Sequence, residues 1–210
     1  MELATADKKD SQGLCFIGKV SLPTFLQQQL KAKEGEIVEI FSDFAEYHKE
    51  KPEFSSKLEE LEYLSAKKNY KKSDGKVIGK HQGAQFYTIG QSKGLGIGGH
   101  KESCFLISRD MENNLVYVGE GRNFPGLFRK ALKIDNSELH WVREDLRLKN
   151  GESMEVMARI RYRQPLEKAT LYQFEEGFFI EFENPQSAIA EGQFAAWYVG
   201  EELLGSGVIS

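Results

Sequence analysis

The second half of the chain contains the stretch KATLYQFEEGFFIEFE, residues 168–183, in which two strand-length runs, KATLYQF and GFFIEFE, follow each other closely. Similar runs recur from about Ala131 to the end of the chain. They read ALKIDNSELHWV (131–142), SMEVMARIRYRQ (153–164), FAAWYVG (194–200) and LLGSGVIS (203–210). Short strands with frequent turn signals are typical of a β-barrel or β-roll. We therefore expect an antiparallel β-barrel domain over residues 123–210.

An earlier series of strand-length runs ends at the Gly- and Pro-containing stretch GRNFPG, residues 121–126, where we place the domain boundary. The runs are GEIVEI (35–40), GKVIGKH (75–81), AQFYTIG (84–90), CFLISRD (104–110) and NLVYVGE (114–120). A helix is expected at 22–33, because apolar side chains recur there at helical spacing and Pro23 suits a first turn. The chain is thus predicted to be mainly β, with one or two helices and a small β-roll domain over residues 1–122.

The segment from 42 to 73 is highly charged and differs from its surroundings. Between Glu53 and Lys72 it has an amphipathic pattern, which predicts a helix. We interpret the segment as a surface helix on an inserted loop, because charged stretches are usually solvated. The alternative is a docking element for RNA or a partner protein. Its lysines suggest this second role: Lys67, Lys68, Lys71 and Lys72, with Lys76 and Lys80 beyond it.

The composition excludes several classes of protein. The 210 residues include 28 Lys plus Arg and 32 Asp plus Glu, so the net charge is −4. A uniformly basic nucleic-acid binder is excluded, but a local basic patch is not. No run approaches the ~18 apolar residues that a membrane-spanning helix needs, and the N-terminus lacks a secretory signal, so no membrane partner is expected. The two cysteines are too few for a disulfide scaffold, which favours a cytoplasmic location.

Cys15 lies in KKDSQGLCFIGK, residues 8–19, and is the first candidate for chemistry. Nearby cations favour the thiolate, which is the form that attacks or carries sulfur. The alternative is a buried structural cysteine, the commoner role of a free thiol. We interpret Cys104, in the apolar run CFLIS, as a core residue. The four histidines are scattered and have no metal-ligand spacing, so no metal site is expected: His48, His81, His100 and His140.

Two turns are candidates for contacts with RNA. The segment YTIGQSKGLGIGGHK, residues 87–101, is rich in glycine, which lets backbone N–H groups approach phosphates, and Lys93 adds a positive charge. It lacks the GK[ST] ending of a Walker A loop, and the alternative is a tight β-turn or bulge. The turn before the final strands contains Gln193, which could form a hydrogen bond with RNA. Trp197, in the strand that follows, is interpreted as core.

The run ending in RIRYRQ carries three arginines at alternate positions. On a strand they would share one face and repel each other unless an anion were nearby. Arginine matches phosphate oxygens, and Tyr162 beside the arginines could stack on a base. The arginines are Arg159, Arg161 and Arg163. The alternative, of equal weight, is cross-strand pairing with the glutamates Glu155, Glu167, Glu181 and Glu183.

Five stretches together resemble the tRNA-specific 2-thiouridylase family. They occur in the family's order and span nearly the whole chain: KKDSQGLCFIGK (8–19), GKHQGAQFYTIGQSKGLGIGG (79–99), DMENNLVYVGEG (110–121), RIRYRQP (159–165) and AIAEGQFAAWYVGEELLGSGVI (188–209). The family has an N-terminal ATP-pyrophosphatase domain, a small central domain and a translation-factor-like C-terminal β-barrel. The resemblance implies that this chain corresponds to the last two, and so to a piece of a longer protein.

The resemblance also implies an activity for the full-length enzyme, that of a tRNA-uridine 2-sulfurtransferase. ATP, bound by the missing N-terminal domain, adenylates the wobble uridine at position 34, and a persulfide sulfur then attacks C2 of that uridine. Cys15 matches the persulfide cysteine, which receives its sulfur from a cysteine desulfurase or a sulfur-relay protein. The substrates are the wobble-uridine tRNAs for Lys, Glu and Gln. This chain lacks the family's SGGxDS motif and first catalytic cysteine, so we expect it to be inactive alone.

By the same resemblance, Arg161 and Tyr162 fall in the RYRQ motif that contacts tRNA, and Gln193 matches a tRNA-contacting glutamine. Lys93 lies in a QRKGLGIG pattern in which Ser92 replaces the usual arginine, and this replacement weakens a phosphate contact there. Two other function classes compete with this reading. One is a stand-alone RNA-binding module without catalysis, and the other is a thiol redox protein using Cys15. Older labels call the family methyltransferases, but nothing here resembles an S-adenosylmethionine site.

Overall fold

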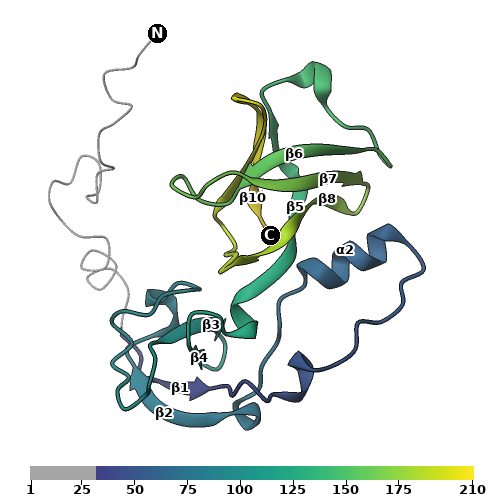
Figure 1. Ribbon diagram of the computed structural model, residues 1–210. Coiled ribbons are helices and arrows are strands. Elements are labelled where there is room, and N and C mark those ends of the chain that lie inside the picture. Colours follow the sequence, from purple (N-terminus) through teal and green to yellow (C-terminus); the bar gives the residue numbers. More distant parts are fainter. Residues whose placement is uncertain (1–31) are drawn as a thin grey trace, which may run out of the picture.

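The computed structural model describes residues 32–210, which form a four-stranded sheet and a closed β-barrel (Figure 1). The two are connected through the 3-10 helix η4 (Pro125–Leu127) and strand β5 (Phe128–Trp141). Cys15 and all but the last two residues of the helix expected at 22–33 lie outside the described residues. None of the described helices is long and apolar enough to cross a membrane. The mainly β fold predicted from the sequence is confirmed.

The sheet is mixed and is buried on both faces. Its strands are β1 (Gly35–Glu39), β2 (Lys76–His81), β3 (Cys104–Asp110) and β4 (Leu115–Glu120), in the order β2-β1-β4-β3. β1 and β4 are parallel, whereas β2 and β3 add to them antiparallel. Ile37 packs with Val118 on one face, and Val38 packs with Tyr117 on the other. Because both faces are covered, two successive residues of β1 are fully buried and apolar.

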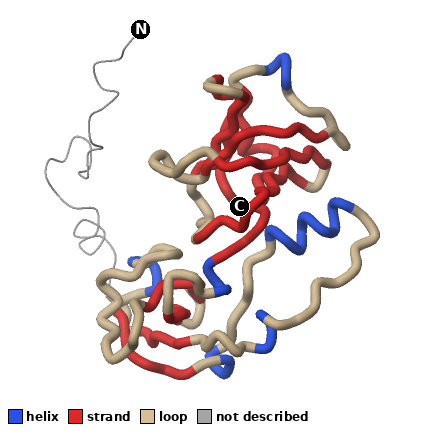
Figure 2. Tube along the Cα trace, viewed as in Figure 1, coloured by secondary structure: helices blue, strands red, loops and turns tan. Residues whose placement is uncertain are grey.

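The barrel confirms the antiparallel architecture expected for the second half of the chain. After β5 come β6 (Ser153–Arg159), β7 (Glu167–Phe174), β8 (Gly177–Ser187), β9 (Phe194–Val199) and β10 (Glu202–Ile209). The barrel strands, which are among the red segments of Figure 2, close in the order β10-β5-β8-β7-β6-β9, and every neighbouring pair is antiparallel. Closure leaves no unpaired edge.

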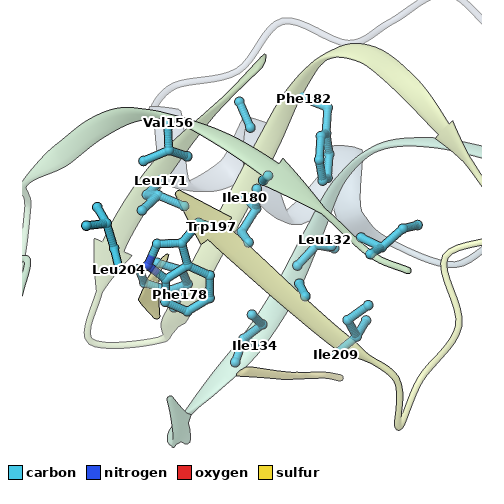
Figure 3. Close-up of a cluster of buried hydrophobic side chains, with 14 of the residues drawn as sticks. Leu132, Ile134, Val156, Leu171, Phe178, Ile180, Phe182, Trp197, Leu204 and Ile209 are labelled. Carbon is cyan, nitrogen blue, oxygen red and sulfur yellow. The ribbon is translucent and has the colours of Figure 1, made fainter. Parts of the chain in front are cut away.

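Large aromatic and aliphatic side chains from most of the strands fill the barrel (Figure 3). Trp197 is fully buried, as expected, and its ring centroid lies 5.0 Å from that of Phe178 and 5.4 Å from that of Trp141. A Cβ atom at Gly205 would lie 2.7 Å from the Trp197 ring. β10 therefore needs glycine where it crosses this ring.

The charged insertion, residues 42–73, extends from the sheet and packs its helix against the barrel. Its helix α2 (Lys57–Ser65) begins at Ser56, whose side chain accepts a hydrogen bond from the Glu59 backbone N–H. Leu61 is fully buried against Ala131 of β5 and Phe179 of β8. The insertion leaves the sheet after β1 and returns to it at β2, so α2 anchors this excursion on the barrel (Figure 1).

α2 is shorter than the helix predicted between Glu53 and Lys72. After Ser65 the backbone becomes extended, and Arg129 donates a hydrogen bond to the Ser65 carbonyl. Tyr70, further along, is buried in the sheet core against Tyr117. Tertiary burial of Tyr70 thus overrides the helical pattern, and it also separates lysines that a continued helix would stack at four-residue spacing.

AQFYTIG, at 84–90, is not the predicted strand. It begins as the 3-10 helix η3 (Ala84–Phe86) and continues as turns. Tyr87 and Ile89 pack against the sheet core, so the alternation of apolar residues reflects burial without a strand ladder. The remaining 3-10 helices of the described chain lie in connections: η1 (Ala45–Tyr47), η2 (Lys72–Asp74) and η5 (Glu144–Leu146).

Candidate nucleic-acid interface

The arginine-rich run forms the end of a strand followed by a turn at residues 160–164, which we call the arginine turn. β6 ends at Arg159, so the strand predicted to continue to Gln164 is too long. The side chain of Gln164 accepts a hydrogen bond from the Ile160 backbone N–H, and its backbone N–H donates to the Arg161 carbonyl. Pro165 follows and has no N–H to continue a ladder. The turn directs Tyr162 to solvent, with 64% of its surface exposed, instead of placing it on the buried face with Ile160.

Arg159 is held by the two tyrosines that flank it. Its Nη2 donates to the Tyr198 hydroxyl at 2.8 Å and its Nη1 to the Tyr162 carbonyl at 3.0 Å. The guanidinium lies 5.0 Å from the Tyr198 ring centroid and 5.8 Å from that of Tyr162. These are cation–π contacts with neutral groups, and Arg159 forms no ion pair with a carboxylate of residues 32–210, so its charge is oriented without being neutralised there.

Arg161 connects the arginine turn to the segment before Gln193. Its Nη2 donates to the Ala188 carbonyl at 2.9 Å. Ala188 has a φ of 54°, a left-handed conformation that alanine rarely adopts, and its N–H donates to Leu127. Arg129 donates to the next carbonyl, that of Ile189, at 2.7 Å, and burial lowers the pKa of Arg129 to about 10. Two arginines thus fix this segment from one side.

The glycine-rich segment meets the barrel at the same point. A Cβ atom at Gly90 would lie 2.5 Å from that of Ala188, so only glycine allows the two segments to approach this closely. Gly90 and Gln91 form backbone hydrogen bonds with Leu106 of β3 at 2.7 and 2.9 Å, which anchor the base of the segment. Lys93 lies beyond this anchor and is exposed. Its backbone carbonyl accepts a hydrogen bond from the Gln91 side chain.

A groove of about 590 Å³ lies beside the arginine turn. Arg161, Arg163 and Gln164 line one part of it, and β8 contributes others, including Gln186. Gln164 donates to the buried Gln186 amide at 2.5 Å, which fixes the floor of the groove. Two guanidinium groups in a groove, with an exposed tyrosine beside them, can bind a phosphate and stack on a base. Gln186 could not be identified from the sequence, because it reaches the site from β8 only after folding.

Gln193 is half-buried in the turn before β9. Its backbone carbonyl accepts a hydrogen bond from Ile209 at 2.8 Å, and its side-chain oxygen is buried without a hydrogen-bond partner in the described part of the chain. The neighbouring Phe194 is 63% exposed, a feature that the sequence analysis missed because the strand pattern there indicates only alternation. The turn therefore exposes an aromatic ring beside a half-buried amide.

The structure also brings together three residues that the sequence left separate. Glu39, His100 and Cys104 place one possible metal ligand atom each within 4.8 Å of one another. His100 Nε2 lies 3.0 Å from Glu39 Oε1. Cys104 is buried, and burial raises the pKa of its thiol to about 11. Spacing could not reveal this cluster, because Glu39 lies 61 residues before His100.

Two protein families have models that match the chain. An aminomethyltransferase β-barrel domain matches residues 131–209, and a tRNA methyl transferase PRC-barrel domain matches residues 62–120. The chain is 61% identical over 210 residues to the tRNA-specific 2-thiouridylase MnmA of Flavobacterium johnsoniae, covering 100% of this chain and 53% of that protein. It is 55% identical over 208 residues to that of Christiangramia forsetii, covering 99% and 53%.

A more distant relative extends this similarity. The tRNA-specific 2-thiouridylase MnmA of Halalkalibacterium halodurans is 37% identical over 208 residues, covering 99% of this chain and 46% of that protein. The chain therefore spans about half the length of the curated relatives it matches.

Proposed function

The chain belongs to the tRNA-specific 2-thiouridylase family, whose C-terminal domains it comprises, and we propose that it binds tRNA and carries sulfur for a tRNA-uridine 2-sulfurtransferase. In this proposal residues 1–122 form the central domain and 123–210 the barrel domain. The relatives are named for action on tRNA, which agrees with the chemistry of the arginine turn. The alternative is a stand-alone RNA-binding module without catalysis.

The observation that carries the tRNA proposal is the exposed Tyr162 between Arg161 and Arg163 at the rim of the groove. Arginines contact phosphates and so fix the register of the RNA, whereas an exposed ring stacks on an unpaired base. Lys93 and Gln193 extend this surface on the two segments that meet near Ala188. These groups position the anticodon arm and take no part in bond making.

The sulfur chemistry is assigned to Cys15, which lies outside the described residues. ATP, held by a nucleotide-binding domain absent from this sequence, transfers AMP to O2 of the wobble uridine and releases pyrophosphate. The terminal sulfur of a Cys15 persulfide then bonds to C2, and AMP leaves with the oxygen. A second cysteine thiolate, which the family resemblance assigns to the nucleotide-binding domain, cleaves the S–S bond and is left in a disulfide with Cys15. The persulfide is a strong nucleophile at neutral pH.

The test of RNA binding is a salt series with a wobble-uridine tRNA for Lys, Glu or Gln and an unmodified RNA hairpin. Replacing Tyr162 with Ala removes stacking, so affinity should fall by the equivalent of about 1–3 kcal/mol with an unchanged salt slope. Replacing Lys93 or Arg161 with Ala should lower the log–log slope by about one.

The matched control for these variants is Lys149→Ala, which removes an exposed lysine from the turn that precedes β6, at the opposite end of that strand from the arginine turn. Equal binding by the Tyr162 and Lys149 variants would contradict this interface.

The test of sulfur carriage separates the enzyme part from a stand-alone module. Incubated with a cysteine desulfurase and cysteine, the chain should gain one labile sulfur atom by mass spectrometry, and Cys15→Ser should not. Labelling of Cys104 in its place would overturn the assignment. The purified chain alone should neither hydrolyse ATP nor thiolate tRNA. ATP-dependent thiolation by this chain would show that it contains the adenylating site itself.

A further inference from the structure

Three chemically different metal ligands converge at one end of the sheet. Glu39 is the last residue of β1, Cys104 is the first residue of β3, and both strands pair with β4 between them. His100 lies near the end of the glycine-rich segment and reaches the same place, with its Nε2 3.0 Å from Glu39 Oε1. The three ligand atoms lie within 4.8 Å of one another. Two of the three positions are therefore fixed by strand register and only one by a turn.

The three side chains are removed from water. Glu39 is 8% exposed, Cys104 is 6% exposed, and 17% of the His100 side chain is accessible. A buried carboxylate is costly unless it is paired or holds a cation, and here its hydrogen-bond partner among the described side chains is the imidazole. His100 Nδ1 is also buried without a partner in residues 32–210. An ion pair of Glu39 with His100 explains one contact but neither the adjacent sulfur nor this second ring nitrogen.

We propose that Glu39, His100 and Cys104 bind a divalent transition-metal ion of the Zn²⁺ class, with a fourth position open toward the glycine-rich segment. Cysteine sulfur, histidine nitrogen and carboxylate oxygen are the ligand types of Zn²⁺. In a tetrahedral site their atoms lie roughly 3–4 Å apart, so small rotations of the side chains are sufficient. The thiol proton passes to solvent when the sulfur–metal bond forms.

The open position faces a pocket of about 300 Å³. Gly98, Gly99 and Ser103 line it together with two of the ligands, so a water molecule or a small anion has access to the metal. Three protein ligands with an accessible fourth position are the arrangement of reactive zinc sites, whereas structural sites have four. The metal would also tie the end of the glycine-rich segment to β1 and β3. Metal binding at this site requires neither tRNA nor Cys15.

The test uses the whole chain with Cys15→Ser, because Cys15 and Cys104 are its two cysteines and any thiolate signal then comes from Cys104. Co²⁺ is the probe, since a cobalt–thiolate bond absorbs in the near ultraviolet. We expect about one Co²⁺ per chain, displaced by Zn²⁺, and no thiolate band after the further change Cys104→Ser. His100→Ala and Glu39→Gln should each weaken binding by ~10-fold or more.

The matched control is His48→Ala, which removes an exposed histidine from the insertion and should bind Co²⁺ as the Cys15→Ser chain does. Zn²⁺ should raise the thermal midpoint of the Cys15→Ser chain by several degrees and raise that of the His100→Ala chain by clearly less, because stabilisation by a ligand falls as its affinity falls. Absence of a thiolate band in the Cys15→Ser chain, or equal affinities for the His100 and His48 variants, would overturn the proposal.

Discussion

Arg129 shows how one side chain can hold several segments in place. Its guanidinium donates to the Ser65 carbonyl, at the end of α2, and to the Ile189 carbonyl, before the Gln193 turn, each at 2.7 Å. Neither acceptor is charged, and burial lowers the pKa of this arginine to about 10, yet it stays protonated near neutral pH. The charged guanidinium therefore donates hydrogen bonds to backbone carbonyls, and leaving those carbonyls without a partner would destabilise the fold.

Replacing Arg129 with Met should lower the free energy of unfolding by about 2–4 kcal/mol, because two partly buried carbonyls lose a charged donor while the aliphatic packing is kept. Urea denaturation measures the change. Lys130→Met is the matched control, since it removes the exposed neighbouring cation on the same strand and should stay within about 0.5 kcal/mol of the parent. Equal effects of the two variants would mean that the carbonyl contacts add nothing.

Only some features of the residues in the candidate interface could be predicted from the sequence. Alternation correctly indicated a strand, whose inward residues Val156 and Ala158 lie in the barrel core. It could not show that the strand ends before Tyr162, because that depends on one hydrogen bond from Ile160 to the Gln164 side chain. The approach of Gly90 to Ala188 joins residues almost one hundred positions apart, and no local pattern encodes it.

Among the elements, α2 is stabilised chiefly by its contact with the barrel. It has only nine residues, which is too short for a stable isolated helix. Leu61→Ala should therefore destabilise the protein by about 2–5 kcal/mol, the usual cost of truncating a fully buried leucine. Glu62→Ala, an exposed change on the same helix, is the control for helix propensity. Denaturant midpoints that shift equally for both variants would show that α2 does not contribute through its apolar contact.

Low pH should weaken the ion pairs that the same helix forms. Lys51 and Lys57 hold the pKa of Glu60 at about 2, well below its ordinary value of 4.5, and Lys57 also pairs with Glu181 of β8 at 2.7 Å. A lowered folded-state pKa stabilises the fold above the unfolded pKa and loses this effect as pH falls. Glu60→Gln should lower the thermal midpoint at pH 7, and the difference from the parent should narrow below about pH 4.5.

The control for this pH dependence is Glu62→Gln, which removes an exposed carboxylate from the same helix. A thermal-midpoint difference for Glu60→Gln that is constant from pH 7 to pH 3 would mean that the pairing with lysines does not contribute.

The strands were mostly predictable from the sequence, and the exceptions have physical causes. Runs such as GFFIEFE and FAAWYVG became β8 and β9, because their turns and apolar residues agree with the final packing. The prediction of a strand at AQFYTIG is wrong, because its apolar residues are buried through turns and not through pairing in a β-ladder. The prediction that the helix continues after Ser65 is wrong, because burying Tyr70 in the sheet core stabilises the protein more than a further helical turn would.

For the whole molecule, the insertion should make the sheet and the barrel unfold together. α2 belongs to a segment that starts and ends in the sheet, yet it buries Leu61 against strands β5 and β8 of the barrel. Domains that share an apolar interface unfold in one transition, and those that do not can separate. The two tryptophans, Trp141 and Trp197, are both in the barrel core, and Cys104 is buried in the sheet. Tryptophan fluorescence therefore reports on unfolding of the barrel, and the Cys104 thiol reports on unfolding of the sheet.

In the Cys15→Ser chain, with a chelator present, tryptophan fluorescence and thiol labelling of Cys104 should report the same urea midpoint. Adding Leu61→Asp places a charge at the interface, so the two midpoints should separate while each part keeps its own core. The exposed change Glu62→Asp is the control and should leave them coincident. If the probes already diverge in the Cys15→Ser chain, then α2 does not couple the two parts. If they remain coincident in Leu61→Asp, the coupling runs through other contacts, such as the approach of Gly90 to Ala188.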